Sequence, residues 1–256
     1  MSNQNILLMT ATITPPTGIS NLKRTDPKIR IQDYEKALKF YLSLVDKGCD
    51  KIIFAENSNS DIASLRHIVQ QSGKADRVEF IVFNGLDYPP HYNRGYGEFK
   101  LLDYAMENSQ FIQSRDIKTI VWKVTGRYIV RNLSQIIASQ PANFDIYCNF
   151  RNFPRRWTDT FLMAWTPDGY QACLKNVYHK LKEVNTPGVP SHASAEELLR
   201  DWLDQQPKGI KFVRRLRTVP QIDGVRGLDN KGYSSDNLWK FYVRVAIQKL
   251  LPWLWI

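Results

Sequence analysis

The feature of this sequence that most limits its fold is a regular alternation, in the first half, of short apolar runs with segments of helical periodicity. The apolar runs occupy residues 6–9, 51–55, 78–83 and 119–123. Between them, apolar residues recur at helical spacing over residues 34–45, 62–70 and 98–108. Because parallel strands are joined by helical crossovers, this order predicts a mostly parallel central sheet flanked by helices.

The second half predicts a less regular continuation of the same α/β domain. It indicates strands near Ile146 and over residues 161–165, helices over residues 169–182 and 195–204, and polar loops over residues 185–192 and 220–235. With 256 residues, of which 43% are hydrophobic, the chain is able to bury one sizeable core. Disordered and low-complexity classes are therefore excluded.

The cysteines and the apolar runs indicate where the protein works. Cys49, Cys148 and Cys173 are odd in number and lack metal-ligand spacing, which predicts buried thiols in a reducing compartment. The sequence has neither the pattern of a signal peptide nor a run of about 20 apolar residues. We therefore expect a cytoplasmic protein.

Polar residues follow the first two predicted strands directly. Thr10 and Thr12 come after the first, and Glu56 and Asn57 after the second. In parallel sheets, ligands bind beyond the carboxyl ends of the strands, so these residues are placed to contact a base and the hydroxyls of a ribose. They equally suit a turn and a helix cap, and both interpretations stay open.

A glycine-rich segment, residues 94–98, precedes the third predicted helix. Gly97 and Glu98 belong to it, and its glycines allow a backbone to approach a ligand closely. The spacing matches neither a phosphate-binding P-loop nor a dinucleotide fingerprint. The position of the segment in the βαβ order is what makes it a candidate for ligand binding.

Two cations stand at the end of the fourth strand, in the run that contains Lys123, Thr125, Gly126 and Arg127. A lysine and an arginine at this edge are suited to neutralise a diphosphate, the arginine by a bidentate fork and the lysine as a point charge. The alternative is that both are solvated loop charges. Their location favours the first interpretation.

Three arginines and several carboxylates form the remaining candidates. Arg151, Arg155 and Arg156 are predicted to bind phosphate or an acceptor, and Asp159 is either their ion-pair partner or a functional acid. Glu196 and Glu197 begin a predicted helix that Ser194 would cap, where carboxylates also stabilise the helix N-terminus. A catalytic base is expected among these three carboxylates, with Glu196 and Asp159 as the named candidates.

Taken together, these segments resemble bacterial glycosyltransferases of the GT-A type, which have a Rossmann-like domain and act in capsule and O-antigen synthesis. The resemblance covers about residues 5–203 and rests on four short segments. They are Leu-Leu-Met-Thr-Ala-Thr (7–12), Phe-Ala-Glu-Asn-Ser (54–58), Gly-Tyr-Gly-Glu (95–98) and Lys-Val-Thr-Gly-Arg-Tyr (123–128).

The resemblance implies a nucleotide-diphosphate sugar donor bound by residues 1–130 and a glycan or lipid-linked acceptor bound by residues 131–235. Thr10, Thr12, Glu56 and Asn57 would line the nucleoside pocket, and Gly97 and Glu98 would border the donor. A carboxylate, Glu196 or Asp159, would deprotonate the acceptor hydroxyl as it attacks the anomeric carbon.

One departure from the family concerns the metal. Enzymes of this type commonly hold a divalent ion on an Asp-x-Asp motif near the fourth strand, and this sequence contains no Asp-x-Asp. We expect Lys123 and Arg127 to stabilise the departing diphosphate in place of a metal, so that no cofactor is needed. Mg²⁺ or Mn²⁺ held by scattered ligands is the alternative.

The C-terminal segment carries most of the net charge. The chain has a net charge of +10, and from Lys208 onward it has ten basic and three acidic residues. Residues 236–256 combine cations with aromatic side chains, which predicts an amphipathic helix on an anionic membrane, at the inner face of the cell membrane. The alternative is a helix packed on the core or on a second subunit of a homo-oligomer.

Two other functions compete with a glycosyltransferase. Basic and aromatic residues also suit a nucleic-acid-binding module, although no signature of such a module is present, so we expect no nucleic-acid partner. A sugar-nucleotide-binding protein without catalytic activity is the second rival, because the missing Asp-x-Asp is compatible with a lost reaction.

Overall fold

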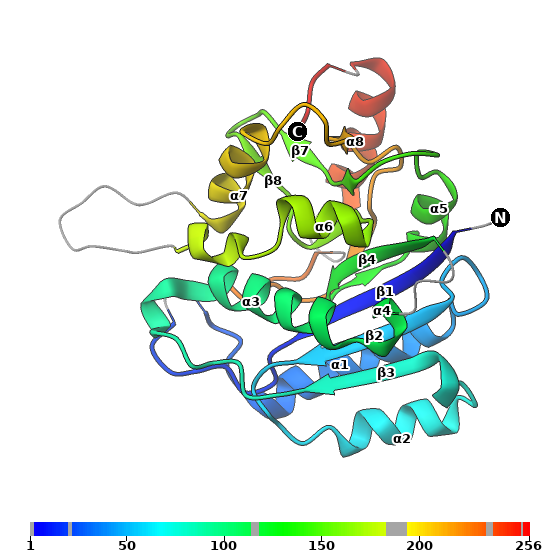
Figure 1. The fold of residues 1–256 in the computed structure, drawn as a ribbon, viewed down its shortest axis with the longest axis vertical. Coiled ribbons are helices and arrows are strands. Elements are labelled where there is room, and N and C mark those ends of the chain that lie inside the picture. Colours follow the sequence, from blue (N-terminus) through cyan, green and yellow to red (C-terminus); the bar gives the residue numbers. More distant parts are fainter. Residues whose placement is uncertain (1–2, 20–21, 114–117, 183–193, 234–237, 252) are drawn as a thin grey trace.

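A seven-stranded sheet runs through the centre of the molecule (Figure 1). The structure is a computed structural model that describes residues 3–19, 22–113, 118–182, 194–233, 238–251 and 253–256. The sheet has the order β10-β6-β9-β4-β1-β2-β3, and β9 pairs antiparallel with both of its neighbours while the other pairs are parallel. The predicted mostly parallel sheet of an α/β domain is confirmed.

Four long strands form the middle of this sheet and one of its edges, and shorter strands complete it. The strands of the sheet are β1 (Gln4–Ala11), β2 (Lys51–Glu56), β3 (Val78–Val82), β4 (Thr119–Thr125), β6 (Ile146–Tyr147), β9 (Leu162–Trp165) and β10 (Phe212–Val213). Two small antiparallel pairs lie outside it, β5 (Ile129–Val130) with β11 (Ile222–Asp223) and β7 (Phe150–Arg151) with β8 (Trp157–Thr158).

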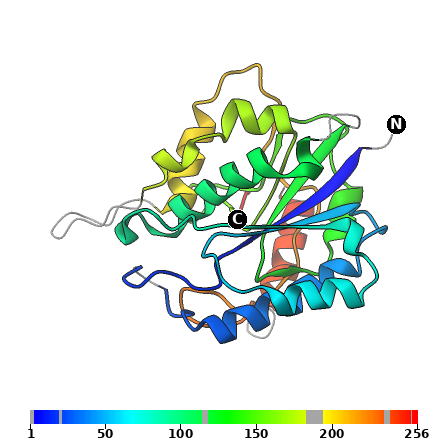
Figure 2. The same cartoon turned by 60° about the horizontal axis from the view of Figure 1, so that its bottom comes forward.

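Helices cover both faces of the sheet, as the edge-on view in Figure 2 shows. One face packs against α1 (Pro27–Leu42), α2 (Ala63–Gln71) and α5 (Leu133–Ala138). The other packs against α3 (Asn93–Asn108), α4 (Gln110–Gln113), α6 (Pro167–Cys173) and α7 (Ala195–Asp204). Single 3₁₀ turns lie at η1 (Ala75–Arg77), η2 (Pro90–Tyr92) and η3 (Val177–Lys180).

Burial on both faces explains why the central strands read as unbroken apolar runs. In β1, Leu7 and Met9 face the α1 side while Ile6 and Leu8 face the α3 side. The helix starts follow local signals in the sequence. Asp26 caps α1, because the Asp26 carboxylate accepts a hydrogen bond from the Lys28 amide at 2.8 Å. Pro27 lies in the first turn of the helix.

Several predicted elements differ from the structure. The helix expected over residues 34–45 begins seven residues earlier, at Pro27, and ends at Leu42. The expected helix over residues 169–182 is broken after α6, because Asn176 takes a left-handed conformation (φ 62°) before the separate 3₁₀ turn η3. The loop expected over residues 220–235 contains strand β11, while the loop over residues 185–192 lies outside the described residues. Strand β4 also ends two residues later than predicted, at Thr125.

The predicted C-terminal helix is present as α8 (Leu238–Leu250), which lies at the top of the molecule in Figure 1. Residues 236, 237 and 252 of the predicted segment lie outside the described residues. No helix within the described ranges is both long and apolar enough to cross a membrane.

Candidate functional site

The strand order changes direction at β1, which places β1 and β4 at a point where ligands bind in open α/β sheets. From β1 the chain builds β2 and β3 on one side and then crosses to β4 on the other. At this edge the Gly126 amide donates to the Thr10 carbonyl at 2.9 Å. A Cβ on Gly126 would lie 2.7 Å from that oxygen, so glycine is required for the strands to meet here.

Lys123 and Glu98 form an ion pair at this edge. Lys123 is fully buried on β4, and its Nζ lies 2.7 Å from Glu98 Oε1 on α3. The same oxygen accepts hydrogen bonds from Thr10 Oγ1 at 2.8 Å and Thr125 Oγ1 at 3.2 Å. Lys123 also donates to the Thr160 carbonyl. The network joins β1, β4, α3 and the loop before β9 around one carboxylate.

The Glu98 carboxylate is ionised at neutral pH. Burial is the largest single influence on its pKa and opposes the charge, but the Lys123 ammonium and the two threonine hydroxyls together hold the pKa below its ordinary value. The Glu98 side chain keeps 22% of its surface exposed. Among the described residues Oε2 accepts no hydrogen bond, so this oxygen is available to a ligand.

A second carboxylate joins the network through Thr160. Thr160 Oγ1 donates to Glu196 Oε1 at 3.4 Å, and Glu196 is half-buried in the first turn of α7. Its neighbour Glu197 has a different role, because Glu197 Oε2 accepts from the Ser194 amide at 2.8 Å in a capping box. Of the two glutamates, only Glu196 is therefore a candidate base.

Lys123 and Arg127, which the sequence predicts to face a diphosphate together, have separate internal partners in this structure. Lys123 forms its ion pair with Glu98 of α3, whereas the Arg127 guanidinium lies 5.2 Å from the centre of the Tyr128 ring. Arg127 Nη1 donates to the Val225 carbonyl at 2.8 Å and its side chain is buried. Lys123 lies within β4 and Arg127 lies after its end, and each of the two cations has an internal partner.

The predicted nucleoside pocket is partly used to hold its own loops. Glu56 is fully buried and accepts from the amides of Ile13 at 2.9 Å, Ser58 at 3.0 Å and Ser60 at 3.1 Å. It therefore ties the loop after β1 to the loop after β2, which is the structural alternative to contact with a ribose. Thr12 Oγ1 donates to Asn57 Oδ1 at 2.6 Å beside it.

The glycine-rich segment is helical instead of a loop. Helix α3 begins at Asn93, five residues before the predicted start, so Gly97 and Glu98 lie within it. A Cβ on Gly97 would lie 1.8 Å from the Tyr88 hydroxyl, which means that Gly97 makes room for this ring. Glu98 thus lies on a helix. The Gly97 backbone packs against Tyr88, where the sequence predicts a close approach to a ligand.

Asp159 has several internal partners, which is the ion-pair alternative of the sequence analysis. Arg151 Nε lies 2.8 Å from Asp159 Oδ1, and Arg151 Nη2 lies 2.8 Å from Oδ2. Asn149 Nδ2 and Trp157 Nε1 donate to the same carboxylate at 2.8 and 3.1 Å. Four donor groups on this one carboxylate hold the β7–β8 hairpin together.

The three arginines of this loop do not converge on one site. Arg151 is buried against Asp159, and Arg156 pairs with Asp204 at 2.7 Å. Arg155 is 74% exposed and lies 3.9 Å from Glu197 at the start of α7. Of the three, Arg155 has the most exposed side chain and the longest ion pair.

Thr160 and the pairing of Lys123 with Glu98 were not predicted from the sequence. A lysine inside an otherwise apolar run is the signal that predicts a buried partner, because charged side chains are almost never fully buried unless paired. The three cysteines are buried as expected, and burial raises the pKa of Cys49 and Cys148 to about 12 and that of Cys173 to about 11. Within the described residues, no group of three His, Cys, Asp or Glu side chains is arranged for a metal ion.

No protein-family model and no curated protein matches the chain. Among solved structures it is similar to a protein of Desulfovibrio desulfuricans G20 described as a nucleotide-diphospho-sugar transferase (10% identity, 83% of this chain and 80% of that chain, TM-score 0.47). It is also similar to the inositol-1-phosphate CTP transferase of T. maritima (12%, 97% and 97%, TM-score 0.42) and to the galactosyltransferase LgtC in complex with donor and acceptor sugar analogues (10%, 82% and 73%, TM-score 0.46). At these identities and scores, the activity of the chain has to be inferred from its own side chains.

Proposed function

We propose that this chain is a glycosyltransferase of the GT-A type that moves a sugar from a nucleotide-diphosphate donor to a hydroxyl group of a glycan or lipid-linked acceptor. The observation that carries the proposal is the ionised carboxylate of Glu98, held by Lys123 where the strand order changes direction. Carboxylates are strong acceptors for the hydroxyls of sugars and ribose. Glu98 Oε2 is the atom we assign to the donor.

In this proposal the two halves of the domain bind the two substrates. The donor lies against residues 1–130, with Thr10, Thr12, Asn57 and Thr125 around it, and the acceptor lies against residues 131–235. Glu56 supports the donor side through the loops that it ties together.

The proposed reaction is a displacement at the anomeric carbon. The acceptor oxygen forms the new bond to that carbon, the bond from the carbon to the diphosphate oxygen breaks, and Glu196 takes the hydroxyl proton. Since Lys123 and Arg127 are bonded internally, we assign the charge of the leaving diphosphate to the exposed Arg155 beside α7. Because the sequence has no Asp-x-Asp, transfer is expected to persist in EDTA.

A screen of UDP-, GDP-, CMP- and dTDP-sugars by thermal unfolding tests the donor site, with and without Mg²⁺ or Mn²⁺. A ligand at about 100 times its Kd stabilises a protein by about 2.7 kcal/mol, which raises the Tm of a domain of this size by at least about 5 °C. We expect one nucleotide class to do so, and Glu98→Gln to remove most of the shift. If oligonucleotides raise the Tm and no nucleotide sugar does, the nucleic-acid-binding alternative holds instead.

A sugar-nucleotide-binding protein without activity is the second candidate. The internal bonding of Lys123 and Arg127 favours it, because both cations predicted to assist departure of the diphosphate are engaged. Turnover separates the two candidates. Release of nucleoside diphosphate from a donor that binds, with a sugar hydroxyl as acceptor, supports the enzyme, whereas tight binding with no release supports the binding protein.

The proposal includes a peripheral location at the inner face of the cell membrane and a role in surface polysaccharide synthesis. Large apolar side chains of α8 and of the residues after it are exposed, and Lys240 and Lys249 are exposed beside them. The most exposed are Trp239 (63%), Tyr242 (62%), Leu250 (75%) and Trp253 (71%). Apolar and aromatic groups flanked by lysines suit the headgroup region of an anionic bilayer.

Vesicle co-sedimentation tests the membrane contact. We expect binding to vesicles that contain anionic lipid at low salt, and replacing both Trp239 and Leu250 with serine is expected to weaken it at least about tenfold, because each side chain contributes about 1.5–3 kcal/mol when buried. Phe153→Ser, which removes another ring that is 62% exposed, is the matched control and should leave binding unchanged. The opposite outcome is that the protein does not bind vesicles, forms a dimer in solution, and becomes a monomer in the double variant. In that case α8 is a subunit interface.

A further inference from the structure

Asn57, which directly follows β2, is a buried amide whose two polar atoms are used differently. The residue keeps 1% of its surface exposed. Its Oδ1 accepts from Thr12 Oγ1 at 2.6 Å, whereas Nδ2 donates no hydrogen bond to any of the described residues. A buried donor without an acceptor costs free energy, and an acceptor that a ligand supplies would remove this cost.

The chain around Asn57 is fixed, so the amide is held where it stands. The Asn57 amide nitrogen donates to the Ala11 carbonyl at 3.1 Å, and the Asn57 carbonyl accepts from the Gly85 amide at 2.9 Å. A Cβ on Gly85 would lie 2.4 Å from the Phe83 ring and 3.2 Å from Asn57 Cβ, so glycine lets the loop after β3 come this close. With its main chain and Oδ1 bonded, Asn57 has Nδ2 as its remaining donor.

Asn57 continues the polar network around Glu98 toward β2. Strand residues two apart point to the same face, and Ala55, two residues before Asn57, packs on the α3 side of the sheet. Contacts run from Asn57 to Thr12, and from Thr10 to Glu98 at 2.8 Å. Thr10 and Thr12 are at most about 7 Å apart, since an extended chain rises about 3.3 Å per residue. One nucleoside is therefore long enough to reach both the Asn57 amide and the Glu98 carboxylate.

We propose that Asn57 Nδ2 selects the base of the donor by donating to a carbonyl oxygen on its ring, so that the chain prefers oxo bases to amino bases. The assignment rests on the proposed function and names the nucleotide class of that site. Uracil, thymine and guanine carry a carbonyl where cytosine and adenine carry an amino group. An amino group would set its own donors against Nδ2 and leave both without an acceptor. The ribose then lies beside Glu98, and the transferred sugar lies toward Glu196.

Titration calorimetry with two pairs of nucleotides, UDP with CDP and IDP with ADP, tests the selection. The members of each pair differ in carrying a carbonyl or an amino group at the recognised position. In the pair that binds, we expect the oxo member to bind at least about tenfold more tightly, because a site built to hydrogen-bond one group rejects a group that cannot pair with it.

Two variants assign the selection to Asn57. Asn57→Asp replaces the donor with an acceptor and still accepts from Thr12 Oγ1, so the preference is expected to reverse in favour of the amino base. Asn84→Asp is the matched control, because it adds the same charge at an exposed position after β3, and it should leave the ratio of affinities within about twofold of wild type. The Tm of each variant is measured first to verify that it folds.

Equal affinities within each pair overturn the proposal. It is also overturned if Asn57→Asp weakens both members of a pair and leaves their ratio unchanged, since Asn57 then only ties two loops together, or if Asn84→Asp shifts the ratio equally. Failure of the proposed reaction has a different result. A preference that follows Asn57, without release of nucleoside diphosphate from the matching sugar nucleotide, keeps the base selection and assigns a binding protein without activity. No binding of any of the four nucleotides overturns both the base selection and the donor site.

Discussion

Replacing Glu196 with glutamine is expected to lower turnover about 10²- to 10⁴-fold, the usual contribution of a general base. Glutamine has nearly the same shape and still accepts the hydrogen bond from Thr160 Oγ1, so the local structure is kept while the proton acceptor is lost. Donor binding should stay within about twofold, because the donor is assigned to the Glu98 side of the network. Steady-state kinetics together with donor titration measure both quantities.

The adjacent carboxylate provides a matched control. Glu197→Gln removes the same charge one residue later in α7, and glutamine also serves in a capping box, so turnover is expected to be within about twofold of wild type. Equal losses in both variants would mean that the charge of the helix start matters and that Glu196 is not the base. A Glu196→Gln enzyme with normal turnover would also remove Glu196 from the proposed reaction.

Lys123→Met is expected to destabilise the protein by about 3 kcal/mol, because it leaves the Glu98 carboxylate without its cation in a largely buried network. The Lys123 side chain is fully buried and also donates to the Thr160 carbonyl, so methionine fills the space and satisfies neither partner. Urea unfolding with an unchanged m-value measures the loss of unfolding free energy.

Removing both charges tests whether the pair is the cause. The double variant Lys123→Met, Glu98→Gln leaves no unpaired charge and keeps an acceptor for Thr10 and Thr125, so most of the lost stability is expected to return. Lys36→Met, which removes a lysine that is 68% exposed and 3.8 Å from Asp223, should cost less than about 1 kcal/mol. If Lys123→Met costs no more than Lys36→Met, the buried ion pair does not form.

The elements that local pattern determines were predictable. The central strands follow from apolar runs that have to be buried on both faces, and α1 begins at Asp26-Pro27 because a capping carboxylate and a proline suit a helix start wherever they occur. Helix α7 has the predicted bounds because Ser194 and Glu197 complete a capping box within four residues. These signals act between neighbours in the chain.

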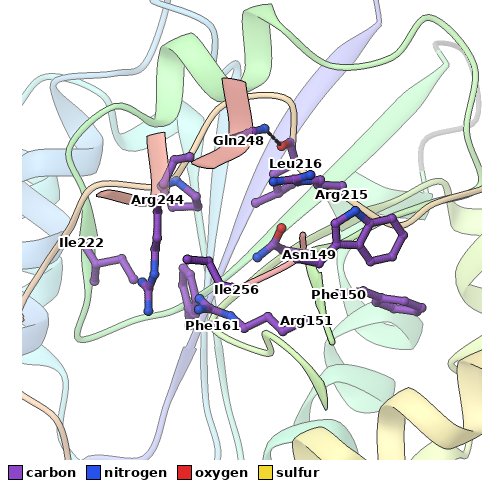
Figure 3. A pocket seen from close by; sticks show the side chains of 13 residues that line it. Asn149, Phe150, Arg151, Phe161, Arg215, Leu216, Ile222, Arg244, Gln248 and Ile256 are labelled. Atoms are coloured by element: carbon purple, nitrogen blue, oxygen red, sulfur yellow. Dashed lines mark hydrogen bonds between the residues drawn. The ribbon is translucent and has the colours of Figure 1, made fainter. Parts of the chain in front are cut away.

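The roles of the charged residues were not predictable in the same way. From the sequence, Asp159 was equally an acid or an ion-pair partner, and only the antiparallel pairing of β7 with β8 brings Arg151 onto both of its oxygens. Glu56 was assigned to a ligand, but the approach of two loops gives it three backbone amides instead. A small cavity under α8 is lined by Arg151, Arg215 and Arg244, which come from three separate parts of the chain (Figure 3).

The sequence by itself determined that the chain forms a mostly parallel α/β sheet with polar residues at its carboxyl edge and a basic aromatic helix near its end. The tertiary structure alone decided that Lys123 neutralises Glu98, that Arg127 donates to the Val225 carbonyl, and that Arg244 lines a cavity. The physical reason is the distance along the chain over which each kind of interaction acts. Hydrophobic periodicity and helix caps depend on residues within one or two turns, whereas the partner of a buried charge depends on which distant elements the completed fold packs against it.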